Sequence, residues 1–265
     1  MSKVVIDLGT YSFKFGLGIK TYAFDPKEIK CSEYGDPYNG KEITDLGAFK
    51  KMINKIFETL EVKPNTCQVL VSTHFHQPYE LDEILANYFF NELEVKGFYI
   101  AYQPVLSMYA CGRLDGLIVE LGKNYVQIVP ARKGWAVFGS IKVGKIDENF
   151  EIETITDLIQ EAINAIGESS HDILLQNIVV AGGPTNNQEF EDKLEKKLAE
   201  IYTEKKLFVI GGQVKTGRQY TALIGGCILV VQATFDSMWI TKEKYQELGQ
   251  EALKVLYTVP KEAQF

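Results

Sequence analysis

A short stretch near the N-terminus carries the residue types of a phosphate site. Residues 4–18 begin with an apolar run that delivers Asp7, turn at Gly9 among small hydroxyl residues, and return through a second apolar run that carries Lys14. Glycine permits a turn with positive φ. Backbone N–H groups and hydroxyls at such a turn can surround a phosphate, and a lysine adds a compact positive charge. The pattern predicts a phosphate-binding strand–turn–strand, with an ordinary hairpin that has a polar tip as the alternative.

Asp7 lies where the first of these strands is expected to end. Mg²⁺ keeps several of its waters in proteins and takes few protein carboxylates. A single carboxylate at this position could therefore hold a hydrated magnesium ion. We predict a metal contact for Asp7 that runs through water.

The same plan occurs a second time about half a chain later. Residues 117–129 again give an apolar strand, an acid (Glu120), a Leu-Gly pair, a polar turn and an alternating strand. Repetition of a whole supersecondary unit predicts two duplicated α/β halves. If the two turns face each other, the phosphates of a nucleotide would lie between them.

Composition and charge narrow the class of protein. The 265 residues include 46% hydrophobic side chains, and the formal net charge is −7. A chain of this length can bury a sizeable core. The acidic balance argues against nucleic acid or an anionic membrane as the main partner, because both need a basic footprint. We find no membrane-spanning run or signal peptide, and the four cysteines are scattered, so we expect reduced thiols in a cytoplasmic protein.

The rest of the chain alternates apolar runs with segments of helical periodicity. Asp45 is a plausible N-cap for a helix with one apolar face. Gly112 is expected to close another helix, and Gly225-Gly226 inside a third predicts close packing. The expected strands include residues 21–24, 67–72, 97–101, 177–181 and 207–210, and the expected helices include 103–112, 152–166 and 218–234. This alternation predicts an α/β fold with mostly parallel or mixed sheets.

Three further stretches carry a resemblance to one family. Residues 99–113 (YIAYQPVLSMYACGR) look like the actin segment that ends one lobe, and residues 180–185 (VAGGPT) resemble the adenosine loop. The segments IGGCIL at 224–229 and FDSMWITKEKY at 235–245 resemble the actin C-terminal signature. Together with the two hairpins they follow the family's order to about Gly249. The sequence is therefore similar to actins and actin-related proteins, within the superfold that also holds sugar kinases and chaperone ATPases.

The resemblance implies a duplicated, ribonuclease H-like α/β fold. Two lobes, each with a mixed β-sheet flanked by helices, would enclose a nucleotide cleft. The first lobe would comprise residues 1–112 and 221–265, and the second residues 113–220. The chain is shorter than an actin: residues 19–42 would be the remnant of one small subdomain. Between Val143 and Asn177 there is room for little more than one helix, so the other small subdomain would be absent.

The resemblance also implies a binding site for ATP or ADP. The first phosphate loop would consist of Asp7, Gly9, Thr10, Tyr11, Ser12 and Lys14, and the second of Glu120, Gly122, Lys123 and Asn124. The purine and ribose would contact Gly182, Gly183, Thr185 and Tyr220. Gln103 matches the glutamine that helps to position the attacking water, and Glu120 is the second candidate catalytic residue.

Three departures from the family pattern bear on catalysis. Glu120 stands where the second loop normally has Asp. Lys123 replaces the next acid of the motif, and this change removes a metal ligand and adds an ammonium group that repels a cation. Tyr11 replaces a glycine, so its ring could crowd the phosphates or fill part of the site. The missing subdomain would leave the adenine exposed on one side. We expect at most weak ATP hydrolysis. Lys123 could contact phosphate oxygens directly or, without nucleotide, pair with Asp7.

A partner surface is implied by the same resemblance. In actins a groove between the lower ends of the lobes is lined by residues that match Tyr109, Ala110, Ile224, Thr234 and Met238. An apolar groove of this kind takes an amphipathic helix, although a core role is the alternative for Ile224. Gln232 would replace an apolar residue there and so alter the affinity for partners.

We therefore predict a minimal actin-like cytoskeletal protein of the cytoplasm that acts through assembly or partner binding, with nucleotide as a structural ligand. Its partners would be actin-binding proteins, further copies of itself or other actin-like subunits. One alternative is a polymerising ATPase that forms filaments. Another is a small-molecule kinase of the same superfold, which is disfavoured because no extra segment remains to form a substrate pocket.

Overall fold

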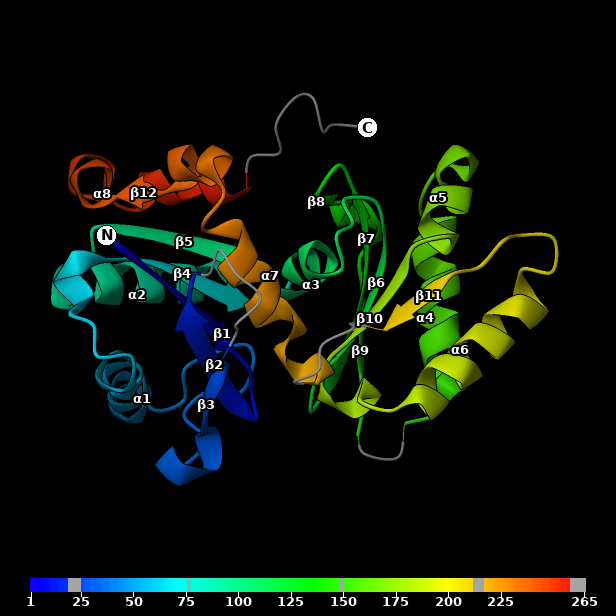
Figure 1. The fold of residues 1–265 in the computed structure, drawn as a ribbon, viewed down its shortest axis with the longest axis horizontal. Helices are drawn as coiled ribbons and strands as arrows, with labels where there is room; N and C mark the ends of the chain where they lie inside the picture. The colour runs from blue at the N-terminus through cyan, green and yellow to red at the C-terminus, as the bar shows by residue number, and fades with distance from the viewer. Residues whose placement is uncertain (19–24, 76, 148–149, 212–216, 258–265) are drawn as a thin grey trace. The chain divides into compact units, whose positions relative to one another are not determined.

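A computed structural model describes residues 1–18, 25–75, 77–147, 150–211 and 217–257 of the chain (Figure 1). These residues form two compact units. Among the described residues, unit 1 is built from Met1–Gln103 and residues 226–257, and unit 2 is built from Pro104–Gly225. The changes of unit therefore lie within the helices α3 (Gln103–Ala110) and α7 (Thr221–Leu229). The strand expected at 21–24 falls outside the described residues.

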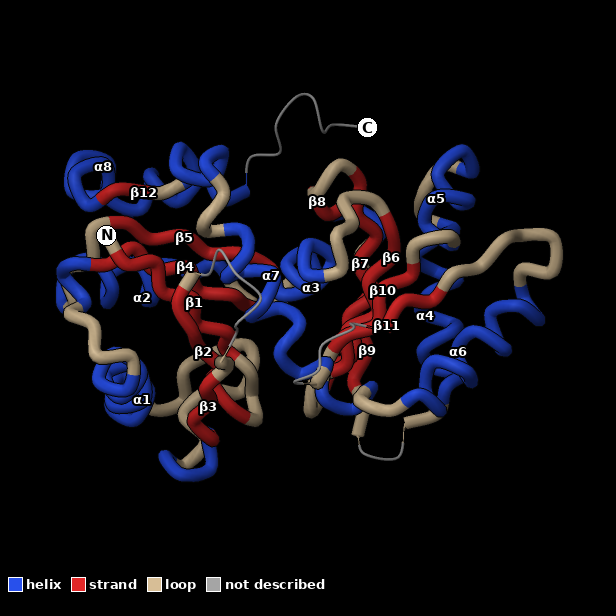
Figure 2. Tube along the Cα trace, viewed as in Figure 1, coloured by secondary structure: helices blue, strands red, loops and turns tan. Residues whose placement is uncertain are grey.

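Unit 1 contains a mixed sheet of six strands in the order β12-β5-β4-β1-β2-β3 (Figure 2). Its central strand β1 pairs antiparallel with β2 and parallel with β4. The register places Asp7 opposite Lys14 on one side and opposite Ser72 on the other. The strands are β1 (Ser2–Leu8), β2 (Ser12–Leu17), β3 (Lys27–Lys30), β4 (Cys67–Thr73), β5 (Gly97–Tyr102) and β12 (Ile240–Thr241).

Helices cover one face of this sheet through aromatic contacts. Helix α1 (Leu46–Thr59) begins where the Asp45 side chain accepts a hydrogen bond from Ala48 N, as predicted, and its Phe49 packs edge-on against Phe13 of β2 at 5.3 Å. Helix α2 (Tyr79–Asn87) continues into a π-helical turn, Tyr88–Glu92, whose Phe89 stacks on Phe98 of β5 at 4.9 Å. Side chains alternate along a strand. Asp7 and Lys14 therefore lie on the face opposite these helices.

The other face of the sheet in unit 1, on which Asp7 and Lys14 lie, is contacted by C-terminal residues. The turn Ala233–Met238 places Phe235 5.0 Å from the ring of Tyr99 on β5 and 5.1 Å from Trp239. Helix α8 (Lys242–Leu248) follows β12, and its Tyr245 stacks at 4.5 Å on Phe90 of the π-helical turn, which lies with α1 and α2 on the first face. The chain after Gly226 thus supplies core residues to the unit that contains the N-terminus.

Unit 2 repeats the arrangement with a second mixed sheet, in the order β11-β10-β6-β7-β8, and β9 pairs with β7. Strand β6 pairs antiparallel with β7 and parallel with β10, as β1 does with β2 and β4. The predicted duplication into two α/β halves is confirmed at the level of the sheets. The strands are β6 (Gly116–Leu121), β7 (Tyr125–Arg132), β8 (Trp135–Ala136), β9 (Lys142–Lys145), β10 (Ile178–Ala181) and β11 (Val209–Gly211).

Three helices cover one face of the second sheet (Figure 1). They are α4 (Ile152–Asn164), α5 (His171–Leu175) and α6 (Gln188–Ile201). Their buried Ile, Leu and Phe side chains pack on alternate residues of β6, β7 and β10 to form the core of unit 2. Between β9 and β10 the described residues hold α4, α5 and a short 3₁₀ turn.

Helix α3 lies on the other face of this sheet. Ser107 of α3 contacts Glu120, which points away from the core formed by its neighbours Val119 and Leu121. Gly225 of α7 lies against α3 so closely that a β-carbon would meet the carbonyl oxygen of Leu106. The close packing predicted for the Gly225-Gly226 pair is therefore confirmed. Gly112, with φ +66°, ends α3 as predicted.

No helix in the part of the chain that the structure describes is long and apolar enough to span a membrane.

Candidate functional site

The carboxylate of Asp7 is the centre of a buried polar network in unit 1. Its Oδ1 accepts hydrogen bonds from Ser72 Oγ (2.6 Å) and Gln103 Nε2 (2.7 Å), and Oδ2 lies 3.4 Å from Lys14 Nζ. The side chains of Asp7 and Lys14 are only 4% and 12% exposed. Each partner comes from a different element, namely β4, the start of α3 and β2. Burial of a charge is tolerated when it is paired and hydrogen-bonded, as Asp7 is here.

Gln103 is occupied by this network. Its amide nitrogen also donates to the carbonyl of Leu8 at 3.0 Å, so both contacts hold the end of β1. The side chain is 4% exposed. In this geometry Gln103 links α3 to Asp7, and the predicted role in positioning a water stays a prediction.

The first turn is tight because the backbone of Ser12 lies close to Gly9. Gly9 N donates to Ser12 O at 3.2 Å, and a β-carbon on Gly9 would lie 2.8 Å from that oxygen. Gly9 does not adopt the positive φ that glycine permits. Glycine is required here by space and not by its φ angle. Thr10 is buried, whereas the Tyr11 side chain is 56% exposed.

Ser12 has a partner that the sequence did not indicate. Its hydroxyl donates to Glu28 Oε2 of β3 at 3.1 Å. The strand register brings Lys30 opposite Ser12 and Glu28 opposite Lys14. A carboxylate therefore lies beside the predicted phosphate loop, and an incoming phosphate must compete with it for the Ser12 hydroxyl.

The residues around Asp7 provide few free oxygen ligands for a magnesium ion. Both Asp7 oxygens have protein partners, and one of those partners is an ammonium group. The described residues contain no group of three or more His, Cys, Asp or Glu side chains placed to hold a metal. A magnesium ion bound here would need phosphates and water for most of its ligands. The residues thus fit a contact through water and do not fit direct coordination.

The second turn, in unit 2, has the same backbone hydrogen bond as the first. Gly122 N donates to Tyr125 O at 2.8 Å. Glu120 is 8% exposed, and its Oε1 accepts a hydrogen bond from Ser107 Oγ at 3.4 Å. Lys123 and Asn124 are exposed at the tip of the turn. The exposed ammonium group is available to an anion, whereas Glu120 is held against α3.

The predicted adenosine loop follows β10 in the same unit. Gly182 has φ +98°, and a β-carbon there would overlap the carbonyl of Leu121, so only glycine fits. Gly183 is exposed, and the nearest atom to a β-carbon built on it is 3.9 Å away. Thr185 is fully buried and its hydroxyl donates to Gly182 O at 2.8 Å. Tyr220 is half-buried and lies in the 3₁₀ turn Arg218–Tyr220, which follows Gly217. The open backbone at Gly183 can approach a flat ring closely.

A family model described as Actin matches residues 18–150 and 138–256, which together cover most of the chain. The chain belongs to the actin family. The membership predicted from the three sequence segments is therefore confirmed, and so is the α/β class with two mixed sheets flanked by helices.

Individual relatives of this actin-family protein match it either over part of its length or at lower sequence identity. Actin-related protein 4 of Gibberella zeae is 30% identical over 120 residues, which cover 45% of this chain and 26% of that protein. The SWI/SNF and RSC complexes subunit arp9 of Schizosaccharomyces pombe is 25% identical over 158 residues, covering 58% and 29%. Putative actin-29 of Dictyostelium discoideum is 22% identical over 337 residues, covering 92% and 87%. The matches thus span little more than a quarter of the two actin-related proteins.

The residues predicted to line a partner groove differ in exposure. In unit 2, Tyr109, Ala110 and Ile224 are half-buried, and the Tyr109 hydroxyl donates to Gly134 O at 3.3 Å. In unit 1, Thr234 is exposed and Met238 is half-buried. Gln232 is exposed and its amide donates to Ile228 O at 3.1 Å. The role of these residues in partner binding stays a prediction.

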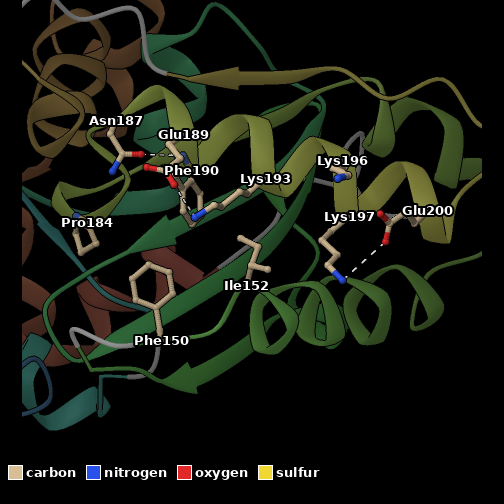
Figure 3. Close-up of a pocket in the computed structure, with 10 residues that line it drawn as sticks. All are labelled: Phe150, Ile152, Pro184, Asn187, Glu189, Phe190, Lys193, Lys196, Lys197 and Glu200. Atoms are coloured by element: carbon tan, nitrogen blue, oxygen red, sulfur yellow. Dashed lines mark hydrogen bonds and ion pairs between the residues drawn. The ribbon is translucent and has the colours of Figure 1, made fainter.

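A hollow of about 570 Å³ lies in unit 2, and Pro184 of the Gly182–Thr185 loop lines it (Figure 3). Its apolar wall includes Phe150 and Phe190, whose rings meet edge-on at 6.1 Å. Of the lysines on its rim, Lys193 pairs with Glu189, and Lys197 pairs with Glu153 and Glu200. These pairs neutralise most of the positive charge, so the hollow does not favour an anion.

A buried acid lies in unit 1 outside the predicted site. Asp82 of α2 is 3% exposed and accepts a hydrogen bond from the Gln77 amide. Burial raises the pKa of Asp82 to about 7, although the hydrogen bond from Gln77 opposes the shift. The carboxyl group therefore keeps its proton to a higher pH than an exposed aspartate does, which the sequence alone did not indicate.

Proposed function

We propose that this actin-family protein binds ADP or ATP as a structural ligand and acts by joining other proteins in an assembly, with weak or no hydrolysis. The first loop, with Gly9 and Lys14, would bind phosphates. The Gly182–Thr185 segment and Tyr220 would bind the adenosine. Lys123 would contact phosphate oxygens that a metal otherwise neutralises.

One observation carries the structural part of the proposal. Gln103, the residue expected to orient the attacking water, has its amide nitrogen engaged by Asp7 and Leu8. Asp7 is in turn held by Lys14 and Ser72. A network that is already satisfied favours a fixed binding site, because a hydrolytic residue must be free to hold water in line with the γ-phosphate.

The assembly part of the proposal rests on a relative. Arp9 of Schizosaccharomyces pombe is named as a subunit of the SWI/SNF and RSC complexes, and this chain matches 29% of it. We propose that this chain likewise works as a subunit, through a surface that includes Thr234 and Met238. A cytoskeletal, cytoplasmic setting is proposed only as the alternative, in which the chain forms filaments. The 92% coverage against a putative actin favours keeping that alternative.

The proposed nucleotide binding is tested on protein purified without added nucleotide. After denaturation, chromatography should release about one adenine nucleotide per chain, and Gly183→Val should lower that amount because its side chain fills the space the base would occupy. Gly139→Val is the control, because a β-carbon there meets nothing within 4 Å. Absence of nucleotide, together with no thermal shift on adding ADP, would exclude the binding proposal.

Hydrolysis and assembly are measured on the same preparation. Gln103→Met should reduce stability while leaving the already slow release of phosphate almost unchanged. A drop in phosphate release of more than about tenfold, or about 1.4 kcal/mol of barrier, would instead assign Gln103 a catalytic role. Sedimentation that depends on ATP would support filaments over a role as a subunit.

A further inference from the structure

Arg218 is linked to the adenosine loop by its backbone. It begins a 3₁₀ turn, Arg218–Tyr220, and its carbonyl accepts hydrogen bonds from Gly182 N (3.1 Å) and Thr221 Oγ1 (2.8 Å). Its own N–H donates to Asn186 Oδ1 at 3.2 Å. Both ends of the loop are therefore tied to a residue that lies more than thirty positions further along the chain.

The side chain of Arg218 makes a second set of contacts with the same loop. Nη1 donates to the carbonyls of Thr185 and Asn187, the latter at 3.0 Å, and Nη2 pairs with Glu191 Oε1. Both side chains of the Arg218–Glu191 pair are 12% exposed. The guanidinium group thus joins the end of the loop to the first turns of α6. A planar fork of donors suits this task, and a lysine cannot reproduce it.

The neighbouring strand leaves space for this pair. A β-carbon on Gly211, at the end of β11, would overlap both Glu191 Oε1 and Arg218 Nη2. Glycine at this position is therefore a condition for the ion pair. The pair is enclosed by β11, α6 and the loop, and removing one partner would leave the other charge poorly solvated.

We infer that Arg218 is a positioning residue for nucleoside recognition, which holds the Gly182–Thr185 loop in the shape that an adenine nucleoside requires. This inference rests on the proposed nucleotide binding. A loop with two consecutive glycines has many unfolded conformations, and ordering it costs entropy. The contacts of Arg218 supply that order before the ligand arrives, so less free energy is lost on binding.

The contacts of Arg218 that the structure records lie in unit 2, at the end of the ligand that carries the base. The inference therefore separates two parts of the binding energy. Loss of the guanidinium fork should weaken recognition of the nucleoside and leave recognition of the phosphates by the first loop unchanged. A general loss of folding would lower both.

The test compares Arg218→Lys with Arg132→Lys. The control also removes an arginine fork from unit 2, where Arg132 contacts Asp115 at 2.8 Å and Ser170 at 2.6 Å. Titration calorimetry gives affinities for ADP and for tripolyphosphate, and hydrogen exchange follows the amides of residues 182, 183 and 185–187 without ligand. For Arg218→Lys we expect ADP affinity to fall about tenfold or more, tripolyphosphate affinity to stay within about twofold, and exchange to accelerate. Arg132→Lys should match the wild type in all three.

Gly211→Ala provides an independent variant that keeps both charged residues. Its methyl group must push Glu191 and Arg218 apart, so it should reproduce the pattern of Arg218→Lys. Unchanged exchange at residues 182, 183 and 185–187 in both variants would overturn the inference, whether or not the protein binds ADP. Wild-type protein that fails to bind ADP would refute the proposed function instead. An equal fall in ADP and tripolyphosphate affinity would also overturn the inference, because it would show general loss of structure.

Discussion

Lys14 and Asp7 lie opposite each other in the β1–β2 pair, with Nζ 3.4 Å from Oδ2 and both side chains largely buried. The ammonium group neutralises Asp7, and it is also the group expected to meet a phosphate. A lysine with two anionic neighbours must divide its donors between them. The stability of unit 1 and the affinity for nucleotide should therefore depend on the same residue.

Lys14→Met should lower the free energy of unfolding by about 2 kcal/mol, because it leaves the buried Asp7 charge without its cation. It should also weaken ADP binding. Lys50→Met is the control, since Lys50 pairs with Glu92 at the surface and such pairs contribute about 0.5 kcal/mol. Denaturant unfolding and calorimetry measure the two effects. A Lys14→Met protein as stable as the wild type would show that Ser72 and Gln103 suffice to hold Asp7.

Asp82 should make stability depend on pH. Because burial raises its folded pKa to about 7, above the value of an unfolded aspartate, the protonated form is favoured in the native state. Its contribution is complete below about pH 4 and is lost as the pH rises through 7, by up to about 1.4 kcal/mol for each unit of pKa shift. Asp82→Asn keeps an oxygen for the Gln77 amide and should therefore stabilise the protein at pH 8 more than at pH 5.

The control for this pH effect is Glu80→Gln, an exposed acid on the same helix. Thermal unfolding of the two variants and the wild type between pH 5 and pH 8 gives the comparison. If Asp82→Asn and the wild type lose stability in parallel as the pH rises, another group is responsible for the dependence.

Gly225→Ala should disrupt the packing of α7 on α3. Its β-carbon would meet the carbonyl of Leu106, and neither backbone can move without shifting a helix. We expect a loss of about 3 kcal/mol. Gly139→Ala, with nothing within 4 Å of the added carbon, should change stability by less than about 0.5 kcal/mol. Equal midpoints of urea unfolding for the two variants would show that the helices can separate at little cost.

Lys123→Asp should increase the dependence of ATP affinity on magnesium. The exposed ammonium group repels a cation, whereas a carboxylate could orient metal-bound water. ATP affinity is measured with Mg²⁺ and with EDTA, and Lys196→Asp, at an exposed position on α6, carries the same change of charge. The prediction fails if the ratio of the two affinities does not differ between Lys123→Asp and the wild type.

Local patterns in the sequence predicted much of the fold. The repeated hairpins indicated two related sheets, Asp45 and Gly112 marked helix ends, and Gly225 marked a close contact. These features depend on neighbouring residues or on the steric limits of one residue, so they can be predicted from the sequence. The reason for glycine at position 9 is not contained in the sequence, because positive φ and close approach of another backbone both select glycine and only the three-dimensional structure distinguishes them.

The partners of the site residues were not predictable in the same way. Ser72 reaches Asp7 through the register of β1 with β4, and Glu28 reaches Ser12 across β2 and β3. Arg218 contacts Glu191 of α6, although the two residues lie 27 positions apart in the sequence. Such pairs are set by tertiary packing, and an isolated charged residue gives no signal of its partner.

The contact between Gly182 and Leu121 has a mechanical consequence for unit 2. Leu121 immediately precedes the Gly122 turn, and its carbonyl fills the space beside Gly182 where any other residue would carry a side chain. Parallel pairing of β10 with β6 holds Ala181 level with Glu120 just before this point. The Gly122 turn and the Gly182 loop are therefore in direct backbone contact, and a displacement of the turn at Lys123 should shift Gly182 as well.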